Sequence, residues 1–287
     1  MRDAAATARR LRAARSADLR LALIGDHIGP SRAPELHRIA GRQAGLCVAY
    51  DLLIPPALEL TFRETLDTAR AAGLAGVNVT APYKERAFEA AAPGDAAVAR
   101  IGAANTVLFT PSGPVCRNTD HSGFLAAWRA RFGDRRPGRA ALLGAGGVGR
   151  AVAFALAALD AELRIFDEDA ARATRLAGEL REAGGAAEAA GLAAALDGAD
   201  GILNCTPLGM AGVPGAPVPA GAFPPAAWAF DAVYTPEDTP FSAMAVAAGA
   251  DLLPGWELFF HQGVDAFALF AGEPVRDQAA LRRALRG

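Results

Sequence analysis

A glycine-rich turn in the middle of the chain restricts the fold more than any other feature of the sequence. The run GAGGVG (144–149) lies directly between a short apolar run, RAALL (139–143), and a segment with helical periodicity, RAVAFALAAL. Its glycines allow a tight turn, close approach of the backbone to a pyrophosphate and close packing of helix on strand. The pattern predicts a Rossmann-type dinucleotide-binding domain, the alternative being a turn with a purely structural role. The residues expected at the dinucleotide are Gly144, Ala145, Gly146, Gly147, Val148 and Gly149.

Three acidic residues at the end of the next predicted strand indicate which dinucleotide binds. Asp167 lies where an acid accepts hydrogen bonds from the adenosine ribose 2′-hydroxyl, and Glu168 and Asp169 follow it. A 2′-phosphate would face these carboxylates, and the repulsion of one such pair at ~4 Å is roughly 1–4 kcal/mol. The sequence therefore predicts NAD in preference to NADP. The alternative for Glu168 and Asp169 is that they cap the helix that follows.

Strand-like runs alternate with helix-like segments along the chain, which is typical of an α/β protein with mostly parallel sheets. The expected strands are 19–25, 46–53, 76–80, 139–143, 162–169, 200–204 and 228–233, with a further short strand inside 183–198 and a hairpin at a sheet edge around 111–113. The expected helices run from Pro34 to Gly45, from Pro55 to near Gly73, from near Ala170, over 255–270 and over 277–286.

This alternation predicts two domains. Residues 1–119 plus 257–287 are expected to form an N-terminal α/β substrate domain, and residues 120–256 a Rossmann-type dinucleotide-binding domain. Residues 1–17 are rich in Arg and Ala, which is typical of a transit peptide but also of a frayed or helical extension. We expect a flexible extension there.

Composition excludes several other classes of protein. The net charge of −2 and the lack of basic runs interleaved with aromatics argue against nucleic-acid and membrane partners, and no apolar run approaches the roughly 20 residues that span a bilayer. The cysteines, Cys47, Cys116 and Cys205, are odd in number and far apart, which favours buried, reduced thiols in a cytoplasmic protein. No metal site is expected, and the chain is expected to be a monomer or a homodimer.

Three polar segments carry candidate catalytic residues, two in the first domain and the third at the predicted crossover to the second. NVTAPYKE (78–85) contains Lys84, GAANT contains Asn105, and NTD contains Asp120. Each lies near a predicted strand end, where α/β sheets bind their ligands. The alternatives are a solvated surface lysine for Lys84 and a helix N-cap for Asp120.

These segments, in order with IGPSRAPELH, GAGGVG, NCTPLGM, FDAVYTP and HQGVDAF, resemble the shikimate/quinate dehydrogenase family from about residue 19 onward. The resemblance implies that Lys84 and Asp120 are the catalytic pair. It implies a substrate pocket lined by Ser31, Asn78, Thr80, Asn105, Tyr234 and Gln262. It also implies a loop near the nicotinamide formed by Thr206, Pro207, Gly209 and Met210.

The chemistry of alcohol oxidation is compatible with a lysine and an aspartate. A hydride and a proton leave the alcohol, so the hydroxyl needs a partner that accepts or relays the proton. A lysine does this where desolvation or a neighbouring cation lowers its pKa, whereas a carboxylate partner favours the charged amine. Asp120 therefore either orients Lys84 and binds a substrate hydroxyl, or shares the proton.

One position departs from the pattern of the family. The family holds the substrate carboxylate with two hydroxyl side chains, and in Ser31-Arg32-Ala33 the second is missing. A lost hydrogen bond to a charged group costs roughly 1.5–3 kcal/mol. Either a water or Tyr234 compensates, or the usual carboxylate substrate is not preferred. The acids at 167–169, with GAGGVG and IGPSRAP, resemble the NAD-using quinate/shikimate branch.

The expected activity is NAD-dependent hydride transfer between nicotinamide and a ring hydroxyl of shikimate, quinate or a close analogue. One alternative is the NADPH-dependent 3-dehydroshikimate reduction of aromatic amino acid biosynthesis. A second, motivated by Ala33, is oxidation of a related ring such as an aminoshikimate. A third is a catalytically silent NAD-binding sensor, against which the retention of Lys84 and Asp120 argues.

Overall fold

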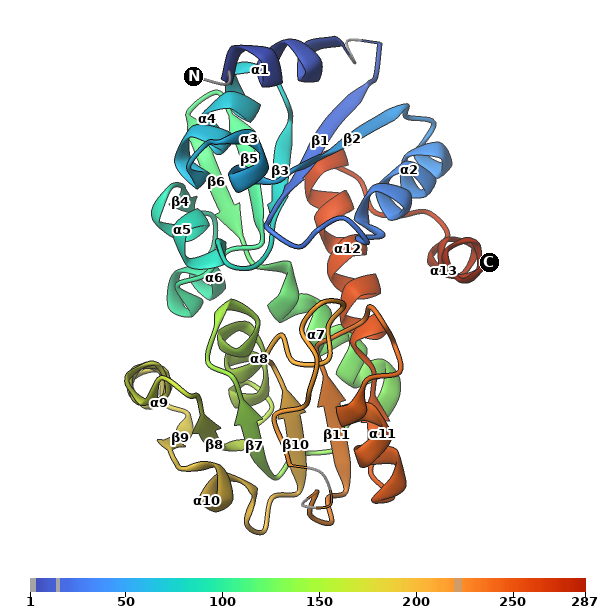
Figure 1. Cartoon of the computed structure of the whole chain (residues 1–287). Helices are drawn as coiled ribbons and strands as arrows, with labels where there is room; N and C mark the ends of the chain where they lie inside the picture. Colours follow the sequence, from blue (N-terminus) through green and yellow to red (C-terminus); the bar gives the residue numbers. More distant parts are fainter. Residues whose placement is uncertain (1–3, 14–15, 220, 222) are drawn as a thin grey trace. The chain divides into compact units, whose positions relative to one another are not determined.

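The computed structural model describes residues 4–13, 16–219, 221 and 223–287, and the chain divides into two compact units (Figure 1). Unit 1 comprises Met1–Thr119 and Gln262–Gly287, and unit 2 comprises Asp120–His261. Both boundaries fall inside helices, α7 (Thr119–Phe132) and α12 (Gly255–Ala271). The second boundary lies after His261 rather than at the expected residue 257, because α12 runs on through that point.

Unit 1 contains a mixed six-stranded sheet in the order β2-β1-β3-β5-β6-β4. Its strands are β1 (Leu19–Ile24), β2 (Val48–Leu53), β3 (Gly76–Val79), β4 (Ala92–Pro93), β5 (Thr106–Thr110) and β6 (Gly113–Arg117). β1 is parallel to β2 and β3, whereas β5 is antiparallel to β3 and β6. The β5–β6 hairpin is the one predicted around 111–113, but it is not at the edge, because the short β4 pairs with β6.

The helices of unit 1 besides the ends of α7 and α12 are α1 (Ala4–Ala13), α2 (Ala33–Ala44), α3 (Pro55–Leu58), α4 (Phe62–Ala71), α5 (Lys84–Glu89), α6 (Ala96–Ile101) and α13 (Gln278–Arg286). The single helix expected from Pro55 to Gly73 is two helices. Glu59 adopts a left-handed conformation with φ of 55° and ends α3. Thr61 and Glu64 then form a capping box that begins α4.

The N-terminal segment contributes to the core of unit 1. In place of the flexible extension expected over 1–17, α1 packs on α4 and buries Leu11 with Phe62 and Leu66. The burial of the Leu11 side chain stabilises the docked helix, since burying a leucine contributes about 1.5–3 kcal/mol to the free energy of folding. Residues 1–3, 14 and 15 lie outside the described part of the chain.

Unit 2 contains a fully parallel sheet in the order β12-β11-β10-β7-β8-β9. Its strands are β7 (Arg139–Leu143), β8 (Glu162–Phe166), β9 (Ala186–Ala189), β10 (Gly201–Asn204), β11 (Trp228–Asp231) and β12 (Asp251–Leu253). This is the doubly wound order, which reverses between β7 and β10. The strand expected inside 183–198 is β9.

Helices cover both faces of this sheet (Figure 1). Besides α7 and α12 they are α8 (Gly147–Ala157), α9 (Ala170–Glu182), α10 (Leu192–Leu196) and α11 (Pro240–Ala247). Leu196 and Phe241 pack with Ile202 in one cluster. Trp128 of α7 packs edge-on against Trp228, with ring centroids 4.8 Å apart. Side chains alternate along each strand, so the two clusters lie on opposite faces.

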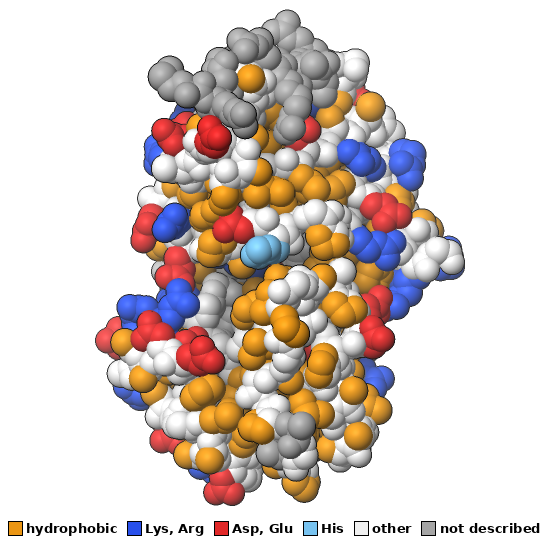
Figure 2. Space-filling view, viewed as in Figure 1, with side chains coloured by type: hydrophobic (Ala, Val, Ile, Leu, Met, Phe, Trp, Pro, Cys, Tyr) orange, Lys and Arg blue, Asp and Glu red, His pale blue; other side chains and the backbone are white. Residues whose placement is uncertain are grey.

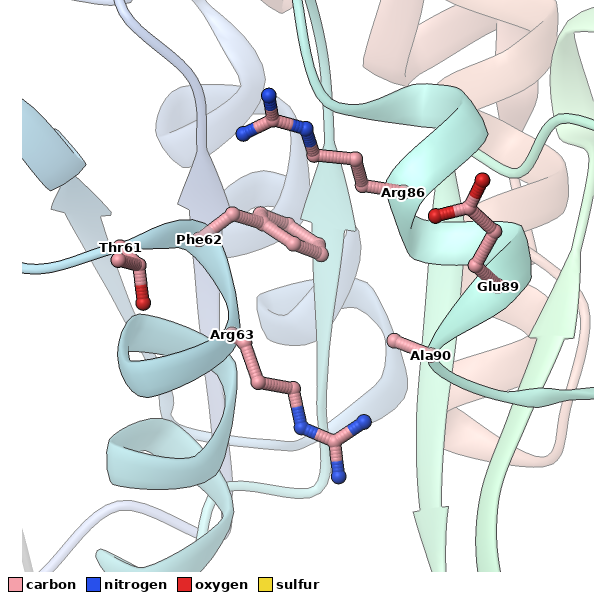
Figure 3. A pocket seen from close by; sticks show the side chains of 6 residues that line it. All are labelled: Thr61, Phe62, Arg63, Arg86, Glu89 and Ala90. Atoms are coloured by element: carbon pink, nitrogen blue, oxygen red, sulfur yellow. The ribbon is translucent and has the colours of Figure 1, made fainter.

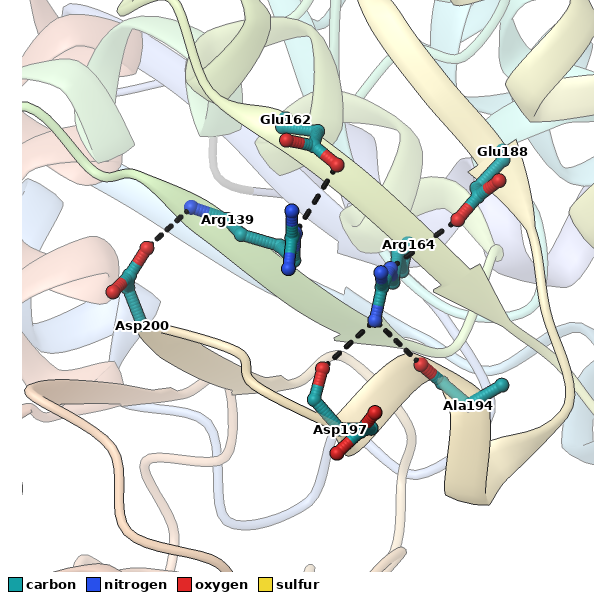
Figure 4. A network of polar contacts seen from close by, with 7 residues as sticks. All are labelled: Arg139, Glu162, Arg164, Glu188, Ala194, Asp197 and Asp200. Atoms are coloured by element: carbon teal, nitrogen blue, oxygen red, sulfur yellow. Dashed lines mark hydrogen bonds and ion pairs between the residues drawn. The ribbon is translucent and has the colours of Figure 1, made fainter.

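A polar network closes the amino end of this sheet (Figure 4). Arg139 donates to Glu162 over 3.1 Å, and its backbone N–H donates to Asp200 over 2.8 Å. Arg164 donates to the carbonyls of Ala194 and Asp197, over 2.9 and 2.7 Å. The network ties β7, β8 and the start of β10 together at the end away from the strand carboxyl ends, so we interpret it as structural.

Neither a helix fit to span a membrane nor a cluster of potential metal ligands occurs in the part of the chain that the structure describes. Figure 2 shows acidic and basic side chains intermixed on the face drawn. The cysteines are free thiols, but only Cys116 is buried, because Cys47 lies in an exposed turn and Cys205 in a partly exposed loop.

His37 is a buried histidine in the core of unit 1. Its Nδ1 lies 2.9 Å from the carbonyl oxygen of Ala33, and the rings of Tyr50, Phe267 and Phe270 surround it. Its Nε2 has no hydrogen-bond partner among the described residues. Burial lowers the pKa of His37 from 6.5 to about 4, against the opposing effect of the Ala33 carbonyl.

We expect this histidine to make the protein sensitive to mild acid. Between pH 6.5 and about 4 the unfolded chain takes up a proton that folded His37 resists. The free energy of unfolding should fall by up to about 3 kcal/mol as the pH drops through that range. His37→Phe should reduce this slope in denaturant titrations, whereas His27→Gln, at an exposed histidine, should leave it intact. Equal slopes in wild type and His37→Phe would contradict the expectation.

Candidate active site

Four polar segments of unit 1 converge at one end of its strands, the carboxyl end of β1 and β3. β1 and β3 are parallel neighbours, so the segments that follow Ile24 and Val79 leave the sheet at the same end of the strands. β5 begins there because it is antiparallel to β3, and β6 ends there because it is antiparallel to β5. The sheet topology therefore brings together IGPSRAP, NVTAPYK, GAANT and the start of NTD, which are far apart in the sequence.

Hydrogen bonds that involve the backbone fix these segments to one another. The N–H of Ala104 donates to the carbonyl of Lys84 over 2.8 Å. The Asn118 side chain donates to the carbonyl of Ala103 over 2.7 Å, and the N–H of Thr119 donates to Oδ1 of Asn105 over 2.7 Å. The start of α5 is thereby tied through GAANT to the start of α7.

Lys84 is the first residue of α5 and is only 7% exposed. The alternative of a solvated surface lysine is therefore wrong. Lys84 is also the only lysine in the sequence, a signal that sequence reasoning missed. Asp120 follows Thr119 directly and is 5% exposed within the first turn of α7, one residue inside the helix rather than before it.

A chain of buried hydrogen bonds joins the predicted amide residues of unit 1. The Tyr50 hydroxyl donates to Oδ1 of Asn78 over 2.8 Å, and Nδ2 of Asn78 donates to the Thr106 hydroxyl over 3.1 Å. The Thr106 hydroxyl donates to Oδ1 of Asn105 over 3.1 Å, and Nδ2 of Asn105 donates to Gln262 over 3.4 Å. Tyr50 and Thr106 are residues that sequence reasoning missed, because their partners lie on other strands.

A second contact joins the loop after β1 to the segment that carries Lys84. The Tyr83 hydroxyl donates to Oδ1 of Asp26 over 2.6 Å. Burial, and then the Asp26 carboxylate, raise the pKa of Tyr83 to about 12, so the tyrosine stays a donor. Thr80 lies under the same loop, because a Cβ on Gly25 would be 2.4 Å from its methyl group.

The motif Ser31-Arg32-Ala33 lies at the end of that loop and the start of α2. The Ser31 hydroxyl accepts from the N–H of Ala33 over 3.3 Å. Arg32 donates to Glu35 over 2.9 Å and to the carbonyl of Leu285 in α13. The C-terminal helix thus braces the loop that carries Ser31, a contact that the sequence alone did not indicate.

A pocket of unit 1 lies elsewhere, between the start of α4 and α5 (Figure 3). Phe62 and Ala90 line it, and the side chains of Arg63 and Arg86 point away from each other. None of the predicted substrate residues lines this pocket, so it is not the candidate active site.

The glycine-rich turn of unit 2 lies at the carboxyl end of β7, at the point where the strand order reverses. Gly144 has φ of 101°, and a Cβ there would be 2.9 Å from the backbone of Cys205 after β10. A Cβ on Gly149 would be 1.9 Å from the carbonyl oxygen of Gly144, so only glycine allows α8 to pack this closely. A Cβ on Gly146 would meet no described atom within 4 Å. The open backbone at the start of α8 fits a pyrophosphate.

Asp167 directly follows β8 beside this turn. One carboxylate oxygen accepts from the N–H of Ala145 over 2.7 Å, and the other from the N–H of Asp169 over 2.9 Å. A carboxylate accepts about four hydrogen bonds, so two positions remain for ribose hydroxyls. Asp169 caps α9 by accepting from the N–H of Ala171, as its alternative interpretation predicted, whereas Glu168 is exposed.

The remaining predicted residues of unit 2 follow β10 and β11. The segment Thr206–Met210 leaves the carboxyl end of β10, and Gly209 has φ of 97°, a conformation that favours glycine. Tyr234 follows β11 and stacks on Phe259, with ring centroids 4.5 Å apart. Both segments lie at the carboxyl ends of strands on the half of the sheet opposite Asp167.

Comparison with known proteins gives consistent matches over nearly the whole chain. Residues 23–107 match the shikimate dehydrogenase substrate-binding domain family. The chain is 37% identical to a quinate/shikimate dehydrogenase (NAD(+)) of Corynebacterium efficiens, over 88% of this chain and 92% of that one. It is 40% identical to a shikimate dehydrogenase (NADP(+)) of Streptomyces avermitilis, over 87% and 89%.

A solved structure agrees with these matches. The quinate dehydrogenase of Corynebacterium glutamicum in complex with NAD superposes with a TM-score of 0.82 and 32% identity, over 93% of this chain and 98% of that one. The glycine turn, the reversal in strand order and these relatives define an oxidoreductase that uses a nicotinamide dinucleotide. The chain belongs to the shikimate/quinate dehydrogenase family.

Proposed function

We propose that the protein oxidises one ring hydroxyl of shikimate, quinate or a close analogue with NAD, and that Lys84 and Asp120 act on the reacting hydroxyl. The observation that carries this proposal is the burial of Lys84 at the end of the strands where the four polar segments meet. The names of the relatives support the substrate class.

The choice of lysine at position 84 supports a role in proton transfer. The sequence has no other lysine, and all its other residues of the Lys/Arg class are arginines. Arginine keeps its proton in proteins, whereas a lysine amine can both lose and regain one. In this proposal Lys84 binds and polarises the hydroxyl, and Asp120 orients the amine or shares the proton. Bound NAD supplies the carbon that accepts the hydride.

The other predicted pocket residues orient the ring. Ser31 and Tyr234 bind the carboxylate, with Tyr234 compensating for the hydroxyl that Ala33 lacks. Thr80, Asn105 and Gln262 contact ring hydroxyls, since orientation supplies much of the rate. Both amide protons of Asn78 are donated inside the protein, to Thr106 and to the carbonyl of Asn105. We therefore propose that Asn78 accepts from a substrate hydroxyl through the lone pair left on Oδ1, and holds Asn105 in place.

For the dinucleotide, we propose that the turn at Gly144–Gly149 and the N-terminus of α8 hold the pyrophosphate and that Asp167 holds the adenosine ribose. The segment Thr206–Met210 lies on the half of the sheet that faces the nicotinamide when the adenosine occupies the half with Asp167. Relatives use either NAD or NADP, so the preference for NAD rests on Asp167.

Rates of dinucleotide reduction over a small panel test this function. We expect reduction of NAD with shikimate or quinate, slower reduction of NADP, and lower rates with amino and decarboxylated analogues. Preference for an aminoshikimate would instead favour the interpretation prompted by Ala33. Preference for NADP would favour the biosynthetic reductase. NAD binding without turnover on any compound would favour the silent sensor and contradict the proposal.

A further inference from the structure

The carboxylate of Asp231, at the end of β11, is completely buried in unit 2. One oxygen accepts from Nδ2 of Asn204 and from the N–H of Val233, both over 3.0 Å. The other accepts from the hydroxyls of Thr239 and Ser242, the latter over 3.0 Å. Burial raises the pKa of Asp231 even though all four contacts oppose the rise. Burying a carboxylate costs free energy, which the four hydrogen bonds offset, and this arrangement indicates a role in the segments that the donors belong to.

On one side the carboxylate fixes the direction of the Asn204 amide. Asp231 can only accept, so Asn204 must present Nδ2 to it and turn Oδ1 toward the loop after β10. That Oδ1 accepts from the N–H and hydroxyl of Thr206, over 3.0 and 2.6 Å. The second proton on Nδ2 is donated to the carbonyl of Leu208 over 3.0 Å. The orientation of one amide therefore sets the backbone of Thr206–Leu208.

On the other side the carboxylate fixes the segment that carries Tyr234. It accepts from the N–H of Val233, next to Tyr234, and from Thr239, which caps α11. The two sides also touch directly. The N–H of Ala211 donates to the carbonyl of Thr235 over 3.2 Å, and a Cβ on Gly209 would lie 3.1 Å from that of Thr239. One buried group thus joins both segments that follow β10 and β11.

We propose that Asp231 is a positioning residue for the nicotinamide half of the dinucleotide site, acting through Asn204 on Thr206–Met210. The inference rests on the proposed function, which assigns that segment to the nicotinamide. The adenosine half of the site is built by β7 and β8, and none of its predicted residues is among the four partners of Asp231. Removing the hydrogen bonds between Asp231 and its partners should therefore weaken the binding of the whole dinucleotide. The binding of a ligand that contains only the adenosine end should be unchanged.

Binding of NAD and of ADP to Asn204→Ala, measured by calorimetry, tests the inference. Loss of the Asn204 hydrogen bonds should weaken NAD by about tenfold, with ADP within about twofold of wild type, from the usual worth of such bonds. Arg164→Ala is the matched control, because it removes two side-chain hydrogen bonds at the opposite end of the same sheet (Figure 4). It should lower the melting temperature and change neither affinity.

Two variants of Asp231 separate positioning from folding. Asp231→Asn keeps one oxygen for Asn204 and Val233, and the hydroxyls of Thr239 and Ser242 can turn to accept from the new amide. It should restore the NAD-to-ADP affinity ratio that Asp231→Ala loses. Equal loss of NAD and ADP binding in Asn204→Ala, or no loss of either, would overturn the inference and leave the proposed function standing. A wild-type protein that binds ADP but not NAD would overturn both.

Discussion

Lys84→Ala lowers kcat by about 10²–10⁴-fold and leaves the affinity for NAD close to that of wild type. The magnitude is that of removing a group that moves a proton in the transition state. The dinucleotide affinity should persist because Lys84 belongs to unit 1, whereas the glycine-rich turn belongs to unit 2. Steady-state rates with shikimate or quinate, together with NAD titrations, provide the measurement.

Two controls make this prediction specific. Lys84→Arg keeps the positive charge but not a removable proton, so it should be impaired to a similar degree. Arg63→Ala removes an exposed cation of the same unit, paired with Asp67, and should keep wild-type kcat. Since Lys84 is the sole lysine, an amine-specific reagent can modify one side chain only, and substrate should protect it. Wild-type turnover in Lys84→Ala would refute the assignment.

Asp167→Asn reduces the preference for NAD over NADP by about tenfold to a hundredfold, measured as the ratio of kcat/KM values. The amide keeps one acceptor for the N–H of Ala145 but removes the charge that would repel a 2′-phosphate, an effect of roughly 1–4 kcal/mol per close pair. NAD should lose affinity and NADP should gain it.

Asp169→Asn is the matched control for this change. It removes a charge two residues farther along, and asparagine caps helices about as well as aspartate, so α9 should be unaffected. The cofactor ratio should move by much less than in Asp167→Asn. Equal shifts in the two variants, or a wild-type preference for NADP, would mean that Asp167 does not distinguish a ribose 2′-hydroxyl from a 2′-phosphate.

Local patterns were sufficient to predict much of the fold. Pro34 and Gly45 bound α2, and the glycine-rich turn lies between β7 and α8, because these signals act within one turn of chain. The break between α3 and α4 escaped prediction because it depends on a left-handed residue that is not a glycine, Glu59. The docking of α1 escaped it because Leu11 gains its burial from distant residues.

The residues of the candidate site could likewise be predicted only where their signal is local in the sequence. Lys84, Asn105 and Asp120 were found because each lies in a polar run near a strand end, and their roles stay predictions. Tyr50 and Asp231 were not found, because each looks like an ordinary strand residue until its partner on another strand is known. Residues that hold a site together through long-range hydrogen bonds carry little local signal.

We expect hydride to move from a ring carbon of the substrate to the nicotinamide, and isotope tracing follows this transfer. Shikimate or quinate carrying deuterium on the carbinol carbon is incubated with the protein and NAD, and the reduced dinucleotide is analysed by mass spectrometry. The deuterium should appear on the nicotinamide ring, and Lys84→Ala should form this product far more slowly. Reduced dinucleotide without the label, or no reduced dinucleotide at all, would contradict the expected transfer.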